Sequence, residues 1–251
     1  MIGGRAQGLA SPAAARGVPI AASVFCAAFL IVSGLGFSVA MSADYAVKKF
    51  VVNAGDTKNP FSENSYVLSD PATADAVLID PGSADPRIAA YVAQNKLQVR
   101  KILYTHAHDD HVGGGRHFAG LFGVAIAGPR ADAGLFSPGE NRPEEWLDGD
   151  STVSIGSLSI RVIATPGHTP GGVCYLAGDN LLSGDTLFKG SIGKPYGDSE
   201  SERAKHQAEL LEAVFNKLLT LPVTTWVYPG HGPSTSLMDE AAENPFLNRR
   251  K

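Results

Sequence analysis

The sequence contains few cysteines and a modest share of charged residues, and both facts narrow the class of protein to which it can belong. Its 251 residues include two cysteines, Cys26 and Cys174, which cannot form a disulfide framework and give no indication of the redox compartment. Charged residues make up 18% and apolar residues 44%, an ordinary globular composition that argues against disorder. The net charge of −4 argues against binding to nucleic acid, including RNA processing.

Acidic residues are absent from residues 1–40, where only Arg5 and Arg16 are charged and residues 18–40 are almost wholly apolar. Such a segment is typical of a secretory signal peptide, and it is also long enough to anchor the protein in a bilayer. A third interpretation is that translation starts at Met41, which leaves an ordinary soluble N-terminus. The protein is expected to be cytoplasmic in the third case, and otherwise exported or membrane-anchored through residues 18–40.

The rest of the chain, residues 44–251, is expected to form one domain, because no linker rich in proline, glycine or serine divides it. Short apolar runs bounded by turn residues predict strands. These lie at residues 46–53, 64–69, 76–80, 99–105, 124–127, 153–155, 158–164, 173–177, 180–183 and 224–228. Residues 129–150 read as a long irregular segment that could cover a site as a flap.

Three helices are predicted between these strands. One opens at Asp85 as N-cap with Pro86 in the first position, one covers residues 116–121, and one follows the capping box of Ser199 and Glu202. The spacing in the third helix predicts a buried stripe. Its members are Ala204, Ala208, Leu211, Phe215 and Leu218.

Histidine is concentrated in one stretch, since three of the seven histidines lie within residues 105–111. The apolar residues 101–104 before it predict a buried strand, so the histidines are expected at a strand's carboxyl end, where α/β sheets place their sites. Imidazole and carboxylate are ligands that zinc, iron and manganese accept. Alone, this stretch is compatible with a site for one metal or for two.

Three later loops each follow a predicted strand and present one residue of a metal-binding type: His168, Asp185 and His231. The four loops together offer five histidines and two aspartates, which is more than one catalytic zinc takes from a protein. The set suits two metals about 3.5–4 Å apart with a carboxylate between them.

The same residues carry a resemblance to the metallo-β-lactamase superfamily, which extends over residues 47–247. It rests on the motif His106-x-His108-x-Asp110-His111 together with His168, Asp185 and His231. The resemblance implies an α+β fold, a four-layer αββα sandwich with the site at one edge. It assigns one metal to His106, His108 and His168, the other to Asp110, His111 and His231, and the bridge to Asp185. The expected cofactors are two divalent metal ions, zinc first, with iron or manganese as alternatives.

Further segments resemble the glyoxalase II branch, the hydroxyacylglutathione hydrolases. Residues 184–188 resemble its bridging segment, and residues 244–247 resemble the ending of its short type. Gly193-Lys194-x-Tyr196 resembles the loop that holds glutathione, which makes Lys194 and Tyr196 candidate substrate-binding residues. Lys194 offers a positive charge for a carboxylate, and Tyr196 offers a phenol donor. The alternative interpretation is that Lys194 and Tyr196 lie in a solvated loop and bind no substrate.

The sequence departs from the longer glyoxalase II type near its end. Only 20 residues follow His231, too few for the helical extension of that type, and Gly232-Pro233 stands where that type has Glu-Tyr. The glutathione site would therefore be incomplete, and the thioester could be a different one.

The function that the resemblance implies is a dinuclear metal-dependent hydrolase of thioesters such as S-D-lactoylglutathione, in which Asp110 binds metal and orients the attacking water. Two cations lower the pKa of water to about 7, and a thiol with a pKa of about 8.5 leaves as thiolate with little protonation. One alternative resembles persulfide dioxygenase with a single iron. The other, a non-catalytic metal or effector-binding module, is disfavoured by the complete ligand set. The oligomeric state stays open.

Five other polar residues receive structural interpretations. Asp80 is expected to brace a histidine ligand, and Asp109 to be exposed or similarly placed. His117 and His206 are expected on helix surfaces, and Cys174 in the core as an unreactive thiol.

Overall fold

The computed structural model describes residues 44–53, 62–136, 139 and 141–248. The signal, anchor and alternative-start interpretations of residues 1–40 lie outside these described residues. By its internal contacts, Met41–Lys251 forms one compact unit. No helix within the described ranges is both long and apolar enough to cross a membrane.

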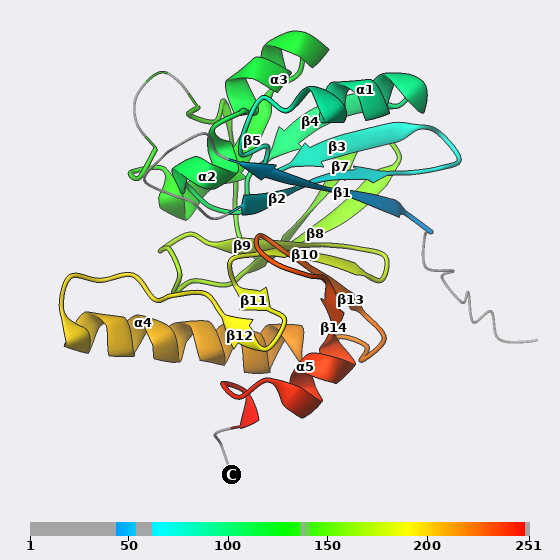
Figure 1. Ribbon diagram of the computed structural model, residues 1–251. Coiled ribbons are helices and arrows are strands. Elements are labelled where there is room, and N and C mark those ends of the chain that lie inside the picture. The colour runs from blue at the N-terminus through cyan, green and yellow to red at the C-terminus, as the bar shows by residue number, and fades with distance from the viewer. Residues whose placement is uncertain (1–43, 54–61, 137–138, 140, 249–251) are drawn as a thin grey trace, which may run out of the picture. The chain divides into compact units, whose positions relative to one another are not determined.

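Two six-stranded sheets lie face to face in this unit, with helices on their outer faces (Figure 1). The first sheet runs in the order β1 (Ala46–Asn53), β2 (Ser62–Ser69), β3 (Asp75–Ile79), β4 (Gln98–Leu103), β5 (Ile126–Pro129) and β6 (Glu145–Leu147). The second runs in the order β14 (Thr235–Ser236), β13 (Trp226–Pro229), β10 (Asn180–Gly184), β9 (Val173–Ala177), β8 (Leu158–Ala164) and β7 (Ser151–Ile155). A small hairpin joins β11 (Leu187–Phe188) to β12 (Ser191–Ile192).

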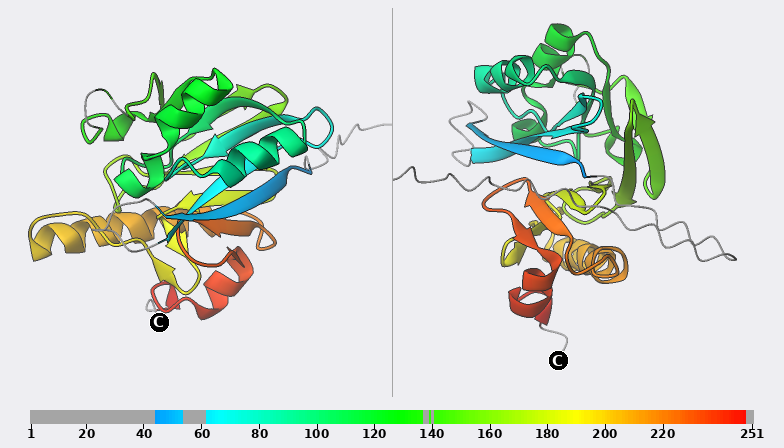
Figure 2. Two further views of the ribbon diagram at one scale, coloured as in Figure 1. Left: turned by 45° about the horizontal axis from the view of Figure 1, so that its top comes forward. Right: turned by 90° about the vertical axis from the view of Figure 1, so that its right-hand side faces the viewer.

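The helices lie on opposite sides of the paired sheets (Figure 2). On the side of the first sheet are α1 (Pro86–Gln94), α2 (Asp109–Val112) and α3 (Gly115–Phe122). On the side of the second are α4 (Glu200–Ala213), which continues as a π-helical turn over Val214–Leu218, and α5 (Leu237–Glu243). A 3-10 turn, η1 (Arg130–Asp132), follows β5 directly.

Three hydrophobic clusters fill the spaces between the four layers, as β3 illustrates. Its side chains alternate, as they must in a strand. Ala76 and Leu78 pack toward α1 and α3, whereas Val77 and Ile79 pack between the two sheets. A third cluster joins the second sheet to α4 and α5. This arrangement confirms the αββα sandwich, and it explains why the β3 run is apolar at successive positions, since both of its faces are buried.

Parallel pairing aligns the strand ends that matter for function. In the first sheet β4 pairs in parallel with β3 and β5, and in the second β10 pairs in parallel with β13. Because the carboxyl ends of parallel neighbours meet at one edge, the loops after β4, β10 and β13 come together there. A backbone bond from Val173 N to Thr105 O (2.9 Å) joins the two sheets at this edge.

The buried face predicted for the third helix was wrong. The structure exposes Ala204 and Ala208 and leaves Leu211 and Phe215 partly buried, so of the predicted stripe only Leu218 is fully buried. The buried face of α4 and its π-helical turn consists of His206, Leu210, Ala213, Val214 and Leu218. Small alanines on two neighbouring faces give a weak pattern, and the π-helical turn shifts the later positions around the axis.

Other boundaries differ more modestly. The strand expected at residues 124–127 begins at Ile126, and the irregular residues 129–150 contain the short strand β6. The strand at residues 224–228 is followed by β14 and α5, which the sequence reading missed. These elements are short, and short elements carry little periodicity.

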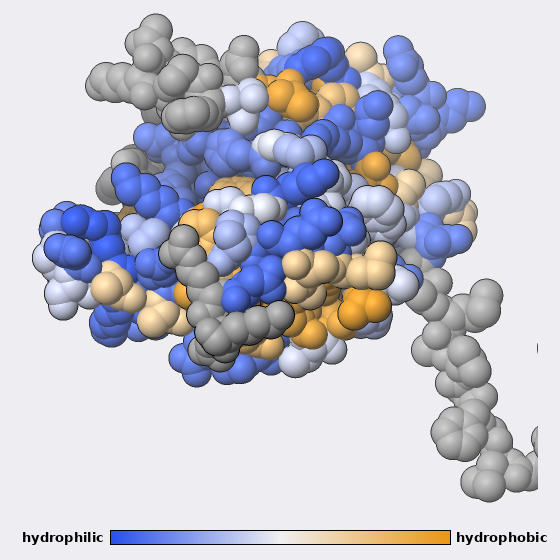
Figure 3. Space-filling view, turned by 60° about the horizontal axis from the view of Figure 1, so that its bottom comes forward, coloured by the Kyte–Doolittle hydropathy of each residue, from blue (hydrophilic) through white to orange (hydrophobic). Residues whose placement is uncertain are grey.

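The surface on the side of α4 and α5 mixes hydrophilic and hydrophobic residues (Figure 3). Three large apolar side chains are more than half exposed: Val223 in the segment before β13, Trp226 in β13 and Met238 in α5. Val223 and Met238 are neighbours, because Met238 N donates to Val223 O (3.1 Å), and the described structure shows nothing that covers these three side chains.

Candidate metal centre

The loops at the common edge bring all seven predicted ligands together. Among the described residues, three groups have ligand atoms that all lie within 4.8 Å of one another. They are His106, His108 and His168, the first cluster; Asp110, His111 and His231, the second cluster; and a third group of Asp80, His106 and His111. Each loop follows its strand as predicted, after β4, β8, β10 and β13. The structure therefore assembles from distant segments the constellation that the spacing and the resemblance indicate.

Ring nitrogens meet at short range in the first cluster. His108 Nδ1 lies 3.0 Å from His106 Nε2 and 3.0 Å from His168 Nε2. Desolvation, together with the neighbouring histidines, lowers the pKa of each of these imidazoles and favours the neutral form, although His106 is buried, His168 is half-buried and His108 is exposed. Neutral imidazole is the form that donates a lone pair to a metal.

Asp185 lies between the two clusters. Its Oδ2 is 3.3 Å from His168 Nε2 of the first cluster and 3.5 Å from His231 Nε2 of the second. Its Oδ1 is 3.3 Å from His111 Nε2. One carboxylate thus faces ligand atoms of both clusters, which is the position a bridging ligand requires.

Two buried atoms at the centre, His111 Nε2 and Asp185 Oδ1, lie 3.3 Å from one another and have no well-formed hydrogen bond to any of the described residues. An unsatisfied buried polar atom costs about 1–3 kcal/mol, so two side by side at one point call for a ligand. A divalent cation bound by both atoms would satisfy them. The donor set of imidazoles and carboxylates fits zinc, iron or manganese.

The electrostatics of the second cluster also suit a cation. Burial opposes protonation of His231, but the carboxylates of Asp110 and Asp185 outweigh it and raise the pKa of His231 to about 10. Burial likewise opposes protonation of His111, but the carboxylates of Asp185 and Asp80 outweigh it and raise the pKa of His111. Burial raises the pKa of Asp110, but His231 and His111 prevail and lower it to about 2. The carboxylates therefore attract positive charge to this point, and a bound metal ion would take the place of the protons on His111 and His231.

Bonds behind the ligands fix their ring orientations. Asp80 accepts from Thr105 N (2.7 Å), Thr105 Oγ1 (2.6 Å) and His111 Nδ1 (3.0 Å). Thr105 Oγ1 in turn lies 3.0 Å from His106 Nδ1, so Asp80 supports one ligand of each cluster. The prediction that Asp80 braces a histidine agrees with these contacts.

The outer nitrogens of His168 and His231 donate to backbone carbonyls. His168 Nδ1 donates to Lys194 O (2.7 Å), and His231 Nδ1 donates to Ser62 O (2.9 Å). Such bonds fix which ring nitrogen faces the site.

Glycines allow these loops to approach one another. Gly184 adopts φ +47°, and a Cβ there would lie 2.4 Å from Thr105 Oγ1. A Cβ on Gly230 would lie 2.3 Å from Asp185 Oδ1 and 2.5 Å from His111 Cε1. Any larger residue at either position would displace the ligands.

The two candidate substrate residues lie in the loop that contacts His168. The Lys194 side chain is exposed, and its backbone carbonyl is the group that accepts from His168. The Tyr196 ring stacks on His206 with centroids 3.6 Å apart. The surface position predicted for His206 was wrong, because His206 is buried under this loop and donates from Nδ1 to Tyr196 O (2.9 Å). His117 and Asp109 are exposed and Cys174 is buried, as predicted.

Two buried carboxyl groups near the centre were missed by the sequence reading. Glu63 on β2 is fully buried, its Oε1 lies 3.8 Å from His111 Nδ1, and burial raises its pKa. Asp132 on η1 is also fully buried and bonds to both loops of the first cluster. Neither residue stands in a metal-ligand spacing, so no sequence signal separated them from surface acids.

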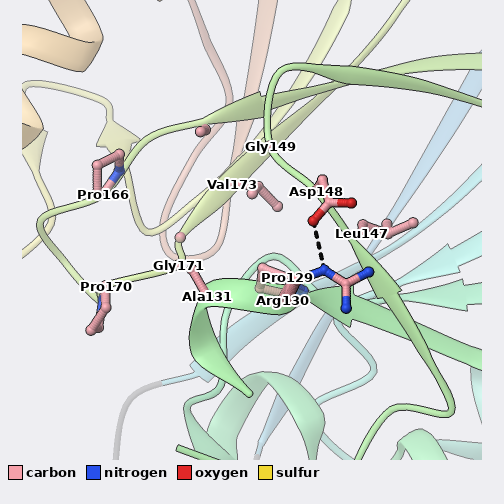
Figure 4. A pocket seen from close by; sticks show the side chains of 12 residues that line it. Pro129, Arg130, Ala131, Leu147, Asp148, Gly149, Pro166, Pro170, Gly171 and Val173 are labelled. Atoms are coloured by element: carbon pink, nitrogen blue, oxygen red, sulfur yellow. Dashed lines mark hydrogen bonds and ion pairs between the residues drawn. The ribbon is translucent and has the colours of Figure 1, made fainter. Parts of the chain in front are cut away.

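A pocket of about 240 Å³ lies beside the loop that carries His168 (Figure 4). Its walls include Pro166 and Pro170 of that loop, and Ala131 of η1. Arg130 and Asp148, also part of its lining, form an ion pair (2.6 Å). The seven predicted ligands do not line this pocket.

Comparisons with known proteins agree with this geometry. The family model of the metallo-beta-lactamase superfamily matches residues 59–231. A probable metallo-hydrolase, YqgX of Bacillus subtilis, is 34% identical over 205 residues, which cover 75% of this chain and 94% of the relative. Hydroxyacylglutathione hydrolase GloC of Haemophilus influenzae is 29% identical over 210 residues, which cover 76% of this chain and 95% of the relative.

Solved structures show the same fold. The structure of TTHA1623 in a di-iron-bound form has a TM-score of 0.61 and 31% identity, and the match covers 75% of this chain and 97% of that one. The structure of ETHE1 from Myxococcus xanthus has a TM-score of 0.66 and 27% identity, and the match covers 82% of this chain and 86% of that one.

Proposed function

Because this chain belongs to the metallo-beta-lactamase superfamily, we propose that it is a dinuclear metal-dependent hydrolase of thioesters such as S-D-lactoylglutathione. The observation that carries the proposal is the position of Asp185, whose carboxylate faces histidines of both clusters at 3.3 Å and 3.5 Å. The similarity to a hydroxyacylglutathione hydrolase supports the thioester substrate, and the similarity to a di-iron protein supports two ions.

Each cluster has a distinct task in this proposal. His106, His108 and His168 would hold one ion, and Asp110, His111 and His231 would hold the other, with Asp185 facing both clusters. When bound, two divalent cations lower the pKa of water and stabilise negative charge on an acyl oxygen.

The chain's own groups orient the reactants. Asp110 is ionised at neutral pH, consistent with its lowered pKa of about 2, so its carboxylate can accept a hydrogen bond from the attacking water. The leaving thiolate needs little protonation, since a thiol pKa is about 8.5. This chemistry therefore requires no separate general acid.

We predict that Lys194→Ala raises KM about tenfold and leaves kcat nearly unchanged, because one charged contact to a substrate carboxylate contributes about 1.5–3 kcal/mol to binding when it is well formed. The backbone carbonyl that accepts from His168 remains in this variant, so metal content should stay at the wild-type value. Steady-state kinetics on lactoylglutathione and on a thioester without a carboxylate test this prediction. A KM that rises equally for both substrates would contradict it.

A panel of thioesters, assayed with fully metallated full-length protein, tests the proposed function. The proposal expects hydrolysis of at least one glutathione thioester with release of free thiol. The same preparation should show no oxygen uptake with glutathione persulfide. Oxygen uptake without hydrolysis of any thioester would favour a mononuclear iron dioxygenase and overturn the proposal.

A further inference from the structure

Asp132 connects the two loops that supply the first cluster. Its Oδ2 accepts from Ala107 N (3.2 Å), which lies between His106 and His108 in the sequence. The same oxygen accepts from Thr169 Oγ1 (2.8 Å), the residue directly after His168, and Oδ1 accepts from Gly171 N (2.5 Å). Three donors from two loops thus converge on one carboxylate whose exposure is 0%.

The packing at this point is adapted to close contact. A Cβ on Gly171 would lie 2.4 Å from Asp132 N and 2.7 Å from Ala131 C, so only glycine permits the approach. Figure 4 shows Gly171 and Ala131 side by side at the wall of the neighbouring pocket. The contact therefore fixes the distance between η1 and the loop of His168.

Of the three histidines in the first cluster, His108 depends most on the hydrogen bonds that Asp132 accepts. His106 and His168 each have a partner for the outer ring nitrogen, namely Thr105 Oγ1 and Lys194 O. In the described part of the chain no hydrogen bond to the outer nitrogen of His108 is found. The position of His108 thus follows from its backbone, which Asp132 holds through the neighbouring Ala107.

We infer that Asp132 is a positioning residue that sets the metal affinity of the first cluster, because it holds the loop of His106 and His108 at a fixed distance from the loop of His168. The inference rests on the proposed two-metal site. The second cluster has other supports, Asp80 for His111 and Ser62 O for His231, so the effect of Asp132 is confined to one of the two ions.

The test is a titration of metal-free, full-length protein with Zn²⁺ in competition with a chelator. Asp132→Asn keeps the volume of the side chain but places an amide NH₂ where a donor now binds, so at least one of the three donors loses its acceptor. The wild type should bind two ions. The variant should bind one of them about 10–100-fold more weakly and the other unchanged, as for other groups that orient metal ligands.

Two variants that each keep only one complete cluster identify which ion Asp132→Asn affects. With His231→Ala only the first cluster remains complete, and adding Asp132→Asn should weaken the remaining tight site. With His168→Ala only the second cluster remains complete, and adding Asp132→Asn should leave it unchanged. Equal weakening in both backgrounds, or in neither, would overturn the inference.

A matched control separates positioning from general stability. Asp75 is likewise buried and accepts from Arg100 Nε (2.6 Å) and Ser157 N (2.9 Å), but it lies at the opposite end of β3 from the site. Asp75→Asn should lower the melting temperature and leave both metal affinities at the wild-type values. If Asp132→Asn does not fold, Thr169→Val removes one donor to the same carboxylate and should weaken the same site.

The outcomes also separate this inference from the proposed function. A wild-type protein that binds only one ion contradicts the dinuclear proposal. A wild-type protein that binds two ions, with an Asp132→Asn variant that binds both equally well, contradicts the role of Asp132 alone.

Discussion

Replacing Asp185 with alanine is expected to remove bound metal and hydrolase activity together. The carboxylate contacts His168 and His231 with Oδ2 and His111 with Oδ1, at 3.3 to 3.5 Å. Its loss takes away the one negative group shared by both clusters, so each ion loses a ligand. We expect kcat/KM to fall at least about 1,000-fold, which corresponds to about 4 kcal/mol of transition-state stabilisation.

The measurement pairs kinetics with metal analysis on the same samples. Asp179→Ala is the matched control, because Asp179 is an exposed aspartate directly before β10, and its backbone carbonyl, which accepts from Trp226 N, is kept in the substitution. The control should keep wild-type metal content and kcat/KM. Wild-type turnover in Asp185→Ala would rule out the bridging role.

Replacing Asp80 with alanine is expected to weaken both folding and metal binding. The substitution leaves three donors without their acceptor: Thr105 N, Thr105 Oγ1 and His111 Nδ1. Each unsatisfied buried donor costs about 1–3 kcal/mol, so the free energy of unfolding should fall by about 3 kcal/mol or more. Because His111 and His106 lose their support, the affinity for metal should fall about 10–100-fold.

Asp80→Asn is the companion variant. Asp80 has φ +47°, a left-handed conformation that asparagine tolerates better than alanine does. The asparagine variant should therefore lose less stability than the alanine variant, and metal affinity should still fall. Chemical denaturation and Zn²⁺ titration measure the two effects. An alanine variant with unchanged metal affinity would contradict the role assigned to Asp80.

The strands that lead into the site were predictable because each is a clear apolar run closed by turn residues. The runs at residues 158–164 and 173–177 have the bounds of β8 and β9. The motif of residues 106–111 and the three single ligands stood at the ends of such runs, where histidine and aspartate are conspicuous. Local pattern was therefore enough to select these residues and to expect them at one edge.

The supporting contacts were not predictable in this way. Asp132 binds donors that lie 25 to 39 residues away, and it stands in a segment without periodicity. His206 was assigned to the surface because the helix pattern gave the wrong buried face, and only packing of the loop at Tyr196 shows its role. Such contacts depend on how loops meet after folding, and no local spacing encodes them.

The most direct measurement is a stepwise titration of metal-free protein with Zn²⁺, in which bound metal and thioester hydrolysis are followed together. Two clusters that share Asp185 predict that hydrolysis reaches its maximum only when two ions are bound per chain. Maximal hydrolysis at one bound ion, with no further gain from a second, would contradict the dinuclear mechanism.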